Sequence, residues 1–197
     1  MESRENRFSL FGIRNYQGDG LFLSVTDQAE RLFEDFEIAD GIVIPTGRYD
    51  VDLRYGLFLN SSNSRPVSVR VFGGTGGFFD GTRDNLSVTT TLRPNRFLRT
   101  STQVELNHVS LPGGSFDSNL YRQRVSFNLN PEMLFNALVQ YNERDDSLGL
   151  NLRFNWIYRP GADLFVVFNQ TWNAPTLSDA QREDRQVVIK FTYLFQR

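Results

Sequence analysis

The segment 148–158 most constrains what this chain can fold into, because hydrophobicity alternates along almost its whole length. Apolar side chains fall at every second position from Leu148 to Tyr158, and polar or small side chains fall between them, with Ile157 as the exception. Period two is the mark of a β-strand with one apolar and one polar face. The segment also has the roughly ten residues that a tilted strand needs to cross a bilayer core. Soluble antiparallel sheets alternate too, so the argument depends on recurrence.

The same alternation recurs through most of the chain, and no helical periodicity competes with it over a comparable length. The further segments are 8–14, 21–26, 49–59, 67–71, 86–92, 98–107, 121–129, 135–141, 162–172 and 187–195. The sequence therefore predicts an all-β fold, namely an antiparallel, up-and-down transmembrane β-barrel. About 10–12 strands are expected in one domain, 1–197, which is either a whole barrel or the C-terminal portion of a larger one.

The connections between these segments differ in length in a regular way. Short connections with turn-forming Pro, Asn, Ser or Gly are expected at 61–64, 94–95, 130–132 and 160–161. Long ones are expected at 28–47, 73–81, 110–119 and 173–185, with 143–146 as a short exception among them. Short periplasmic turns and long outer loops are the habit of outer-membrane barrels.

The aromatic residues cluster at the two ends of the expected strands. With the short turns placed at the periplasmic end, one belt comprises Phe97, Trp156, Tyr158, Tyr193 and Phe195, and the other comprises Tyr49, Tyr121, Tyr141 and Trp172. Such belts are expected at membrane interfaces because aromatic rings are amphipathic. The alternative is a soluble sandwich or lipocalin-like barrel whose aromatics fill a core.

Composition excludes several function classes. The chain has no cysteine, so it has neither a disulfide framework nor a thiolate metal site. Its net charge of −2 leaves no large basic field for nucleic acid. No run approaches the eighteen or so apolar residues of a membrane helix. A mean hydropathy of −0.38 resembles that of a soluble protein, but every second residue of a membrane barrel faces a polar interior. The charged start of the chain, which lacks an apolar core, is not expected to act as a signal peptide.

Four stretches resemble the C-terminal barrel of a bacterial outer-membrane family whose own function is unclear. They are 41–50 (GIVIPTGRYD), 111–116 (LPGGSF), 156–165 (WIYRPGADLF) and 189–195 (IKFTYLF). Members of that family carry a carbohydrate-binding family 9-like module ahead of the barrel. The resemblance implies an outer-membrane location and a barrel fold. It carries over no sugar-related role, because such a role would belong to the upstream module, which is not expected within these 197 residues.

Charged residues that alternate with the apolar positions must avoid lipid. The residues expected to line the lumen are Arg54, Arg70, Arg99, Glu105, Arg122, Arg124, Arg153 and Lys190, together with Asp50 and Asp52. In a small barrel such side chains fill the interior with ion pairs and hydrogen bonds. In a wider one they line a water channel, and the excess of Arg over acidic residues favours anions.

No catalytic, cofactor or metal site is expected. His108 and Ser110 would share a strand face, but no oriented base and oxyanion site can be identified. The acidic segment with Glu34, Asp35, Glu37 and Asp40 lacks the ordered spacing of a calcium loop. The glycines at 73–77 lack the Lys-Ser/Thr ending of a phosphate loop and are interpreted as a flexible loop.

The predicted function is that of a passive outer-membrane channel or translocation scaffold, not an enzyme. The alternatives are a plugged structural or binding barrel that acts through its outer loops, and, third, a barrel hydrolase. Expected partners are outer-membrane lipid, the barrel-assembly machinery through the final strand ending Tyr193-Leu194-Phe195, and a second chain, but no nucleic acid. Eleven candidate strands are an odd number, whereas bacterial single-chain barrels use even ones. Either ten strands close, or the chain belongs to a larger barrel; the hairpin sequence at 17–20 favours the second.

Overall fold

The computed structural model describes residues 2–176 and 179–194, and its regular elements there are all β-strands. The strands are β1 (Glu2–Arg14), β2 (Gly20–Leu32), β3 (Phe36–Ala39), β4 (Ile42–Ile44), β5 (Gly47–Asn60), β6 (Val67–Phe78), β7 (Gly81–Leu92), β8 (Leu98–Leu111), β9 (Gly114–Asp117), β10 (Leu120–Asn130), β11 (Met133–Asn142), β12 (Ser147–Arg159), β13 (Ala162–Asn173) and β14 (Gln181–Tyr193). No helix among these residues is long and apolar enough to span a membrane.

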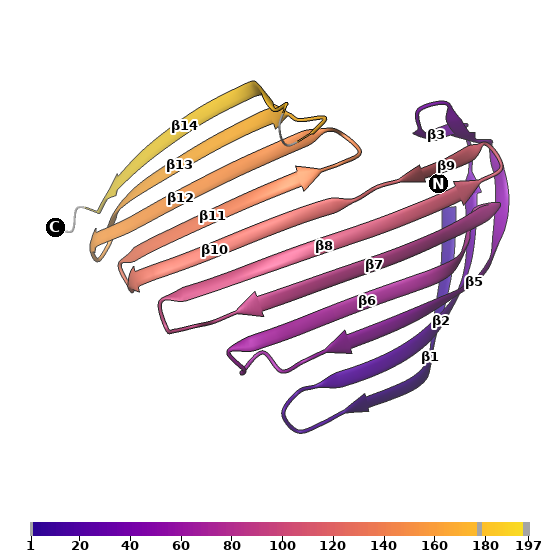
Figure 1. Ribbon diagram of the computed structural model, residues 1–197, viewed down its shortest axis with the longest axis horizontal. Coiled ribbons are helices and arrows are strands. Elements are labelled where there is room, and N and C mark those ends of the chain that lie inside the picture. Colours follow the sequence, from indigo (N-terminus) through magenta and orange to yellow (C-terminus); the bar gives the residue numbers. More distant parts are fainter. Residues whose placement is uncertain (1, 177–178, 195–197) are drawn as a thin grey trace. The chain divides into compact units, whose positions relative to one another are not determined.

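The long strands follow one another in hydrogen-bonded order, as Figure 1 shows. The order is β1-β2-β5-β6-β7-β8-β10-β11-β12-β13-β14, β9 pairs with β8, and β3 and β4 form a separate two-stranded sheet. The pairs whose register is described are antiparallel. Each strand therefore pairs with the next long strand of the chain, which confirms the predicted all-β, antiparallel, up-and-down fold.

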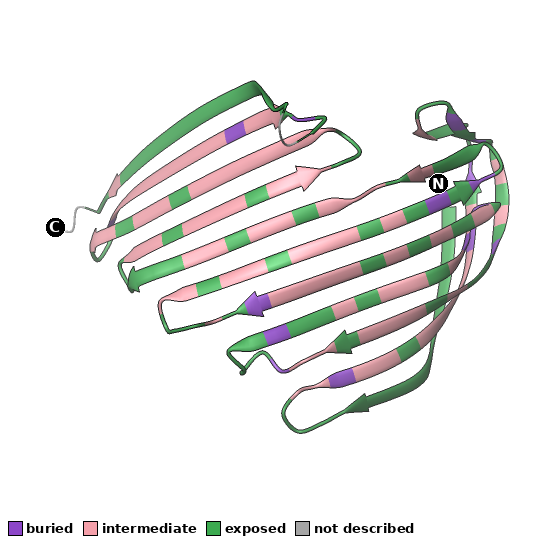
Figure 2. Cartoon of the chain, in the orientation of Figure 1, coloured by how far each residue is buried: buried purple, intermediate pink, exposed green. Residues whose placement is uncertain are grey.

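The chain divides into two compact units. Unit 1 comprises Met1–Ser64, Ser68–Thr89 and Val104–Asn119, and unit 2 comprises Arg65–Val67, Thr90–Gln103 and Leu120–Arg197. Within unit 1, β2 is the one described hydrogen-bonded neighbour of β1; within unit 2, β13 is that of β14. Strands β1 and β14 are exposed along almost their whole length (Figure 2).

Unit 2 has one apolar and one polar sheet face, because its strands pair in continuous register. Directly opposed residues point to the same face. One row runs Val125↔Ala137↔Leu152↔Phe168↔Val187, and another runs Phe127↔Phe135↔Phe154↔Val166↔Ile189. The neighbouring row runs Ser126↔Asn136↔Arg153↔Val167↔Val188 on the other face. β13 thus also places Phe165 and Val167 among the polar residues, which explains why its hydrophobicity pattern is the least regular.

Unit 1 follows the same plan until an irregularity interrupts it. Rows such as Leu23↔Leu57↔Gly73 lie on its apolar face, and Thr26↔Arg54↔Gly76 lies on its polar face. Between Thr26 and Gln28, strand β2 advances two residues while β5 advances three, from Arg54 to Val51. One extra residue in β5 is a β-bulge, and it reverses the facing of every residue beyond it.

The bulge overturns the facing predicted for Tyr49 and for Asp50. Tyr49 was expected on the lipid side with Leu57, but it lies on the polar face with Arg54. Its ring packs edge-on against Phe79 with centroids 5.2 Å apart, and its hydroxyl donates to the carbonyl oxygen of Pro45 at 2.6 Å. Asp50 was expected to point inward, but it opposes Ala29 on the other face. Alternation cannot predict this, because the bulge has no residue signature in β5 itself.

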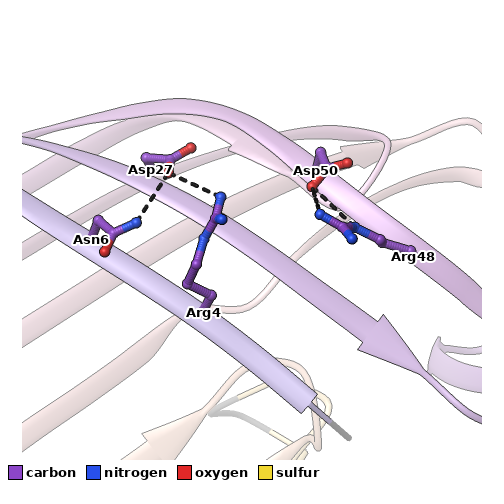
Figure 3. A network of polar contacts seen from close by, with 5 residues as sticks. All are labelled: Arg4, Asn6, Asp27, Arg48 and Asp50. Carbon is purple, nitrogen blue, oxygen red and sulfur yellow. Dashed lines mark hydrogen bonds and ion pairs between the residues drawn. The ribbon is translucent and has the colours of Figure 1, made fainter.

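The polar network of Figure 3 marks where the apolar face of unit 1 ends. Beyond the row Phe8↔Val25, the next positions on that face are Asn6 and Asp27. Asp27 accepts hydrogen bonds from Arg4 at 3.4 Å and Asn6 at 3.3 Å, and Arg48 pairs with Asp50 at 3.1 Å. Strands β1, β2 and β5 therefore change from apolar to charged along a single face.

The predicted long loop at 73–81 is wrong, because these residues form the end of β6 and the start of β7. Only Phe79 and Asp80 connect the two strands. A Cβ on Gly76 would lie 2.3 Å from the carbonyl oxygen of Leu53, and one on Gly77 would lie 2.5 Å from that of Asp52. The glycines thus let β6 pass close to the bulged part of β5, so they serve backbone packing rather than flexibility.

The chain's described hydrophobic core lies at one end of unit 1, on the polar side of the sheet. Its buried members are Leu32, Ile42, Ile44, Phe79, Val109 and Leu111. The β3–β4 hairpin, within the expected 28–47 loop, supplies Ile42 and Ile44, and Ile42 also packs against the turn at Gly113 and Gly114. The hairpin therefore covers part of the polar face there.

Two residues of the acidic segment stabilise this hairpin. Asp35 accepts a hydrogen bond from the backbone N–H of Thr46 at 2.7 Å, and Glu37 accepts one from that of Gly41 at 2.9 Å. Carboxylates that cap backbone donors in this way have a structural role in the hairpin.

Candidate functional site: the polar face

A chain of side-chain hydrogen bonds crosses the polar face of unit 2. Arg122 of β10 donates from Nε to Oε1 of Gln140 on β11 at 3.0 Å, and from Nη1 to Oε1 of Gln103 on β8 at 3.5 Å. Ser126 donates to Oδ1 of Asn136 at 2.8 Å. Because the polar groups lie opposite one another, the strand register itself satisfies them.

A second set of side-chain hydrogen bonds lies on the polar face of β12, β13 and β14. Asn151 donates from Nδ2 to Oδ1 of Asn169, and Asn169 donates to Oε1 of Gln186 at 3.5 Å. Arg153 donates from Nε to Oδ1 of Asn151 at 2.9 Å. Lys190 lies on the same face, opposite Phe165. The amides therefore form a ladder beside which the long cationic side chains lie.

Three of the predicted lumen residues surround one hollow in unit 2, of about 270 Å³. It is lined by Arg99, Ser101 and Gln103 of β8, by Arg122, Arg124 and Ser126 of β10, and by Leu138 of β11. The lining residues follow period two on both β8 and β10, as expected for side chains that rise from one face. Sequence alternation thus placed Arg99, Arg122 and Arg124 on one face, and the strand pairing brings them together.

A second hollow, of about 280 Å³, lies on the polar face of unit 1. Arg54 lines this hollow. It donates hydrogen bonds to the carbonyl oxygen of Gly77 at 3.2 Å and to Oδ1 of Asn85 at 3.2 Å. Arg83 donates to Oδ1 of Asn107 at 2.7 Å and lies over the ring of Phe78, 5.6 Å from its centroid. Arg7 also lines this hollow, but its guanidinium pairs with Glu5 at 2.9 Å.

Two further predicted lumen residues, Arg70 and Glu105, lie on the polar face without joining either hollow. Arg70 opposes Asn60 in register, next to the row of Phe58 and Phe72. Glu105 has the parity of Asn107 along β8 and is partly buried. Their assignment to a lumen stays a prediction.

An aromatic row on the polar face was missed by the sequence argument. Phe22, Phe58 and Phe72 oppose one another across β2, β5 and β6, and the first two rings have centroids 6.1 Å apart. Gly12 faces Phe22, and a Cβ there would lie 2.9 Å from its ring. The available signal was the phase of these phenylalanines, which fall between the apolar positions of their strands.

The predicted belts form two rows on the apolar face of unit 2. At one end Tyr121 stacks on Tyr141, centroids 6.2 Å apart, and Leu148 links Tyr141 to Trp172 in register. At the other end Tyr158 stacks on Phe191 at 5.6 Å beside Trp156, while Tyr193 lies under Arg159. Phe97 lies in the β7–β8 connection, and Phe195 lies outside the described residues. Their position at a membrane interface stays a prediction.

Along β8, His108 points to the opposite face from Glu105 and Asn107. Its Nδ1 contacts Oδ1 of Asp117 at 2.7 Å, and both side chains are more than half exposed. Among the described residues no hydrogen bond joins His108 to Ser110, and no group of three or more acidic or histidine side chains could hold a metal ion.

Comparisons with known proteins add little to this geometry. No family model matches the chain, and no curated protein is significantly similar to it. One solved structure, the NanC porin in a rhombohedral crystal form, aligns over 98% of this chain and 94% of that one, with 11% identity and a TM-score of 0.43. The resemblance to a family with an upstream carbohydrate-binding module stays a prediction.

Proposed function

We propose that the chain forms, or belongs to, an outer-membrane β-barrel that acts as a passive channel. The observation that carries this proposal is the apolar face of unit 2, which runs in register over five strands and remains uncovered. Phe135, Val139 and Trp156 are 37%, 40% and 39% exposed, and Ile189 and Phe191 are 68% and 65% exposed. A contiguous apolar surface of this kind is a liability in water and is stable against lipid.

The strand lengths agree with this environment. β12 has 13 residues, and a rise of about 3.3 Å per residue extends it to roughly 40 Å. A tilt of about 45° shortens its projection to close to the 25–30 Å of the hydrocarbon layer. The soluble alternative predicts a second layer that buries this face, whereas large side chains of this face in unit 2, such as Phe135 and Val139, are exposed.

The polar face supports passage of hydrated solutes, with a preference for anions. Among the described contacts of this face, Arg54, Arg122 and Arg153 each donate to a neutral amide or carbonyl oxygen. No step in such passage requires a nucleophile or a bound cofactor, so we propose a channel rather than an enzyme. Rings of cationic side chains bias a water-filled pore toward anions.

Conductance across a planar lipid bilayer tests this function. The purified protein is expected to produce discrete current steps. In a salt gradient, the sign of the reversal potential is expected to show that anions permeate more readily than cations. Protein that is inserted into liposomes, as shown by protease protection, and yet gives no current steps would contradict the channel and favour a plugged barrel.

The plugged barrel is a second candidate because the β3–β4 hairpin covers part of the polar face of unit 1. Leu32 and Tyr49 of the sheet pack with Ile44 of the hairpin. Replacement of 33–46 by a two-residue Asn-Gly turn is expected to raise conductance if the hairpin obstructs the path. Unchanged conductance would place the hairpin outside it.

A further inference from the structure

The hollow between β8 and β10 concentrates positive charge. Its lining contains the three guanidinium groups of Arg99, Arg122 and Arg124 and no acidic residue. Arginine is protonated at every physiological pH, so all three charges are present together. Cations that share one small space repel one another, and a bound anion relieves this repulsion.

The three arginines are not equally engaged. Arg122 is oriented by Gln140 and Gln103 on the two neighbouring strands. In the described part of the chain, no hydrogen bond or ion pair engages the guanidinium of Arg99 or Arg124, and both residues are exposed. The hollow therefore contains one guanidinium group whose direction is fixed by hydrogen bonds, that of Arg122. The guanidinium groups of Arg99 and Arg124 are available to a ligand.

The neutral groups of the lining are also suited to an anion. Ser101, Ser126 and Gln103 can each donate a hydrogen bond from a hydroxyl or an amide. Guanidinium groups bind the paired oxygens of carboxylate and phosphate through two parallel hydrogen bonds. Three such groups match a ligand with several anionic oxygens better than one with a single charge.

We propose that this hollow is a binding site for a small multivalent oxyanion, with Arg99 and Arg124 as the residues that bind it and Arg122 as the third, preoriented contact. The site requires only the local pairing of β8 and β10 in unit 2. It therefore goes beyond the proposed channel and does not depend on whether the barrel conducts.

Calorimetric titration of the detergent-folded full chain tests this site, with pyrophosphate and citrate as separate probes and acetate as the monovalent comparison. One equivalent of pyrophosphate or citrate is expected to bind at low salt, and acetate is expected to bind at least tenfold more weakly. The stronger of the two multivalent probes identifies phosphate or carboxylate as the preferred group.

Variants locate the site. Arg99→Gln and Arg124→Gln are each expected to weaken binding of the stronger probe about tenfold or more, because each removes a charged hydrogen-bonding partner. Arg124→Lys keeps the positive charge but lacks the paired N–H donors of a guanidinium group. Its affinity for the stronger probe is expected to lie between those of wild type and Arg124→Gln. Arg153→Gln removes a charge on the same face but outside the hollow and is expected to bind like wild type.

Heat-modifiable migration in SDS shows which variants have folded, and only folded protein is titrated. If Arg153→Gln and Arg124→Gln lost the same amount of affinity, binding would depend only on the general charge of the surface. That result would overturn the site. No binding of either multivalent probe to folded wild-type chain would also overturn it, while current steps in the bilayer experiment would leave the channel intact.

Discussion

Arg122 of β10 and Gln140 of β11 face each other in strand register, with Nε of the arginine 3.0 Å from Oε1 of the glutamine. The bond joins two adjacent strands on the polar face and fixes the direction of one guanidinium. Cross-strand pairs of this kind help to order a sheet surface that carries many cations, because a polar side chain can bond to one on the neighbouring strand.

The ion preference of the proposed channel is expected to follow the arginines of this face. Replacement of both Arg122 and Arg124 by Glu changes the summed charge of these two positions from +2 to −2 and should weaken or reverse anion preference. Reversal potentials in a salt gradient measure this directly. Unchanged conductance and selectivity in a folded double variant would favour a plugged barrel or a path remote from β10.

The apolar face of unit 2 should not tolerate charge. Leu152→Arg and Val139→Arg place a guanidinium in the middle of the apolar rows, at a cost of about 2–4 kcal/mol at the midplane of such barrels. We expect both variants to fail to fold into liposomes, as measured by protease resistance. Asn151→Arg, on the neighbouring position of the polar face, should fold; equal tolerance at the three sites would refute the lipid-facing assignment.

The glycines of β6 give a matched pair of substitutions. Gly76 has a φ of 138°, and an added Cβ would lie 2.3 Å from a backbone oxygen, so Gly76→Ala should lower the yield of folded protein strongly. Gly73 has no atom within 4 Å of such a Cβ. Gly73→Ala is therefore expected to fold normally. Refolding yields measure the difference, and equal yields for the two variants would indicate a flexible loop at 73–77 instead of a crowded strand.

The hairpin core should behave as a local unit. Ile44 is 2% exposed, and Ile44→Ala should cost about 2–5 kcal/mol through the cavity it leaves. Hydrogen exchange is expected to accelerate in 33–46 and in the β6–β7 turn but not in β10–β14. Val43→Ala, at a position that is 48% exposed, is the control. Protection that falls equally in β10–β14 would show that the hairpin core supports the whole chain.

The sequence predicts the strands well and their local deviations poorly, for physical reasons. Period two is fixed by the strand backbone, so 148–158 identifies β12 and its faces without further information. The bulge near Val51 depends on pairing with β2, which is distant in the chain, and it reverses Tyr49 and Asp50. A run of glycines is found both in flexible loops and in crowded strands, so the sequence alone does not distinguish the two. For this reason the loop predicted at 73–77 is wrong, and these residues belong to β6.

The candidate site shows the same division. Alternation places Arg99, Arg122 and Arg124 on the polar face, but only strand pairing shows that they surround one hollow. The β3–β4 hairpin and its contacts with Phe79 and Val109 combine segments far apart in sequence, and no local pattern reports such contacts.

Cysteine accessibility across the two faces of β12 tests the central claim most directly, because the chain has no cysteine of its own. Leu152→Cys and Arg153→Cys occupy adjacent positions on opposite faces. In liposomes, a membrane-impermeant maleimide should label Arg153→Cys rapidly and Leu152→Cys only after detergent is added. Rapid labelling of Leu152→Cys in intact liposomes, at a rate close to that of Arg153→Cys, would contradict a strand with one face in lipid and the other in water.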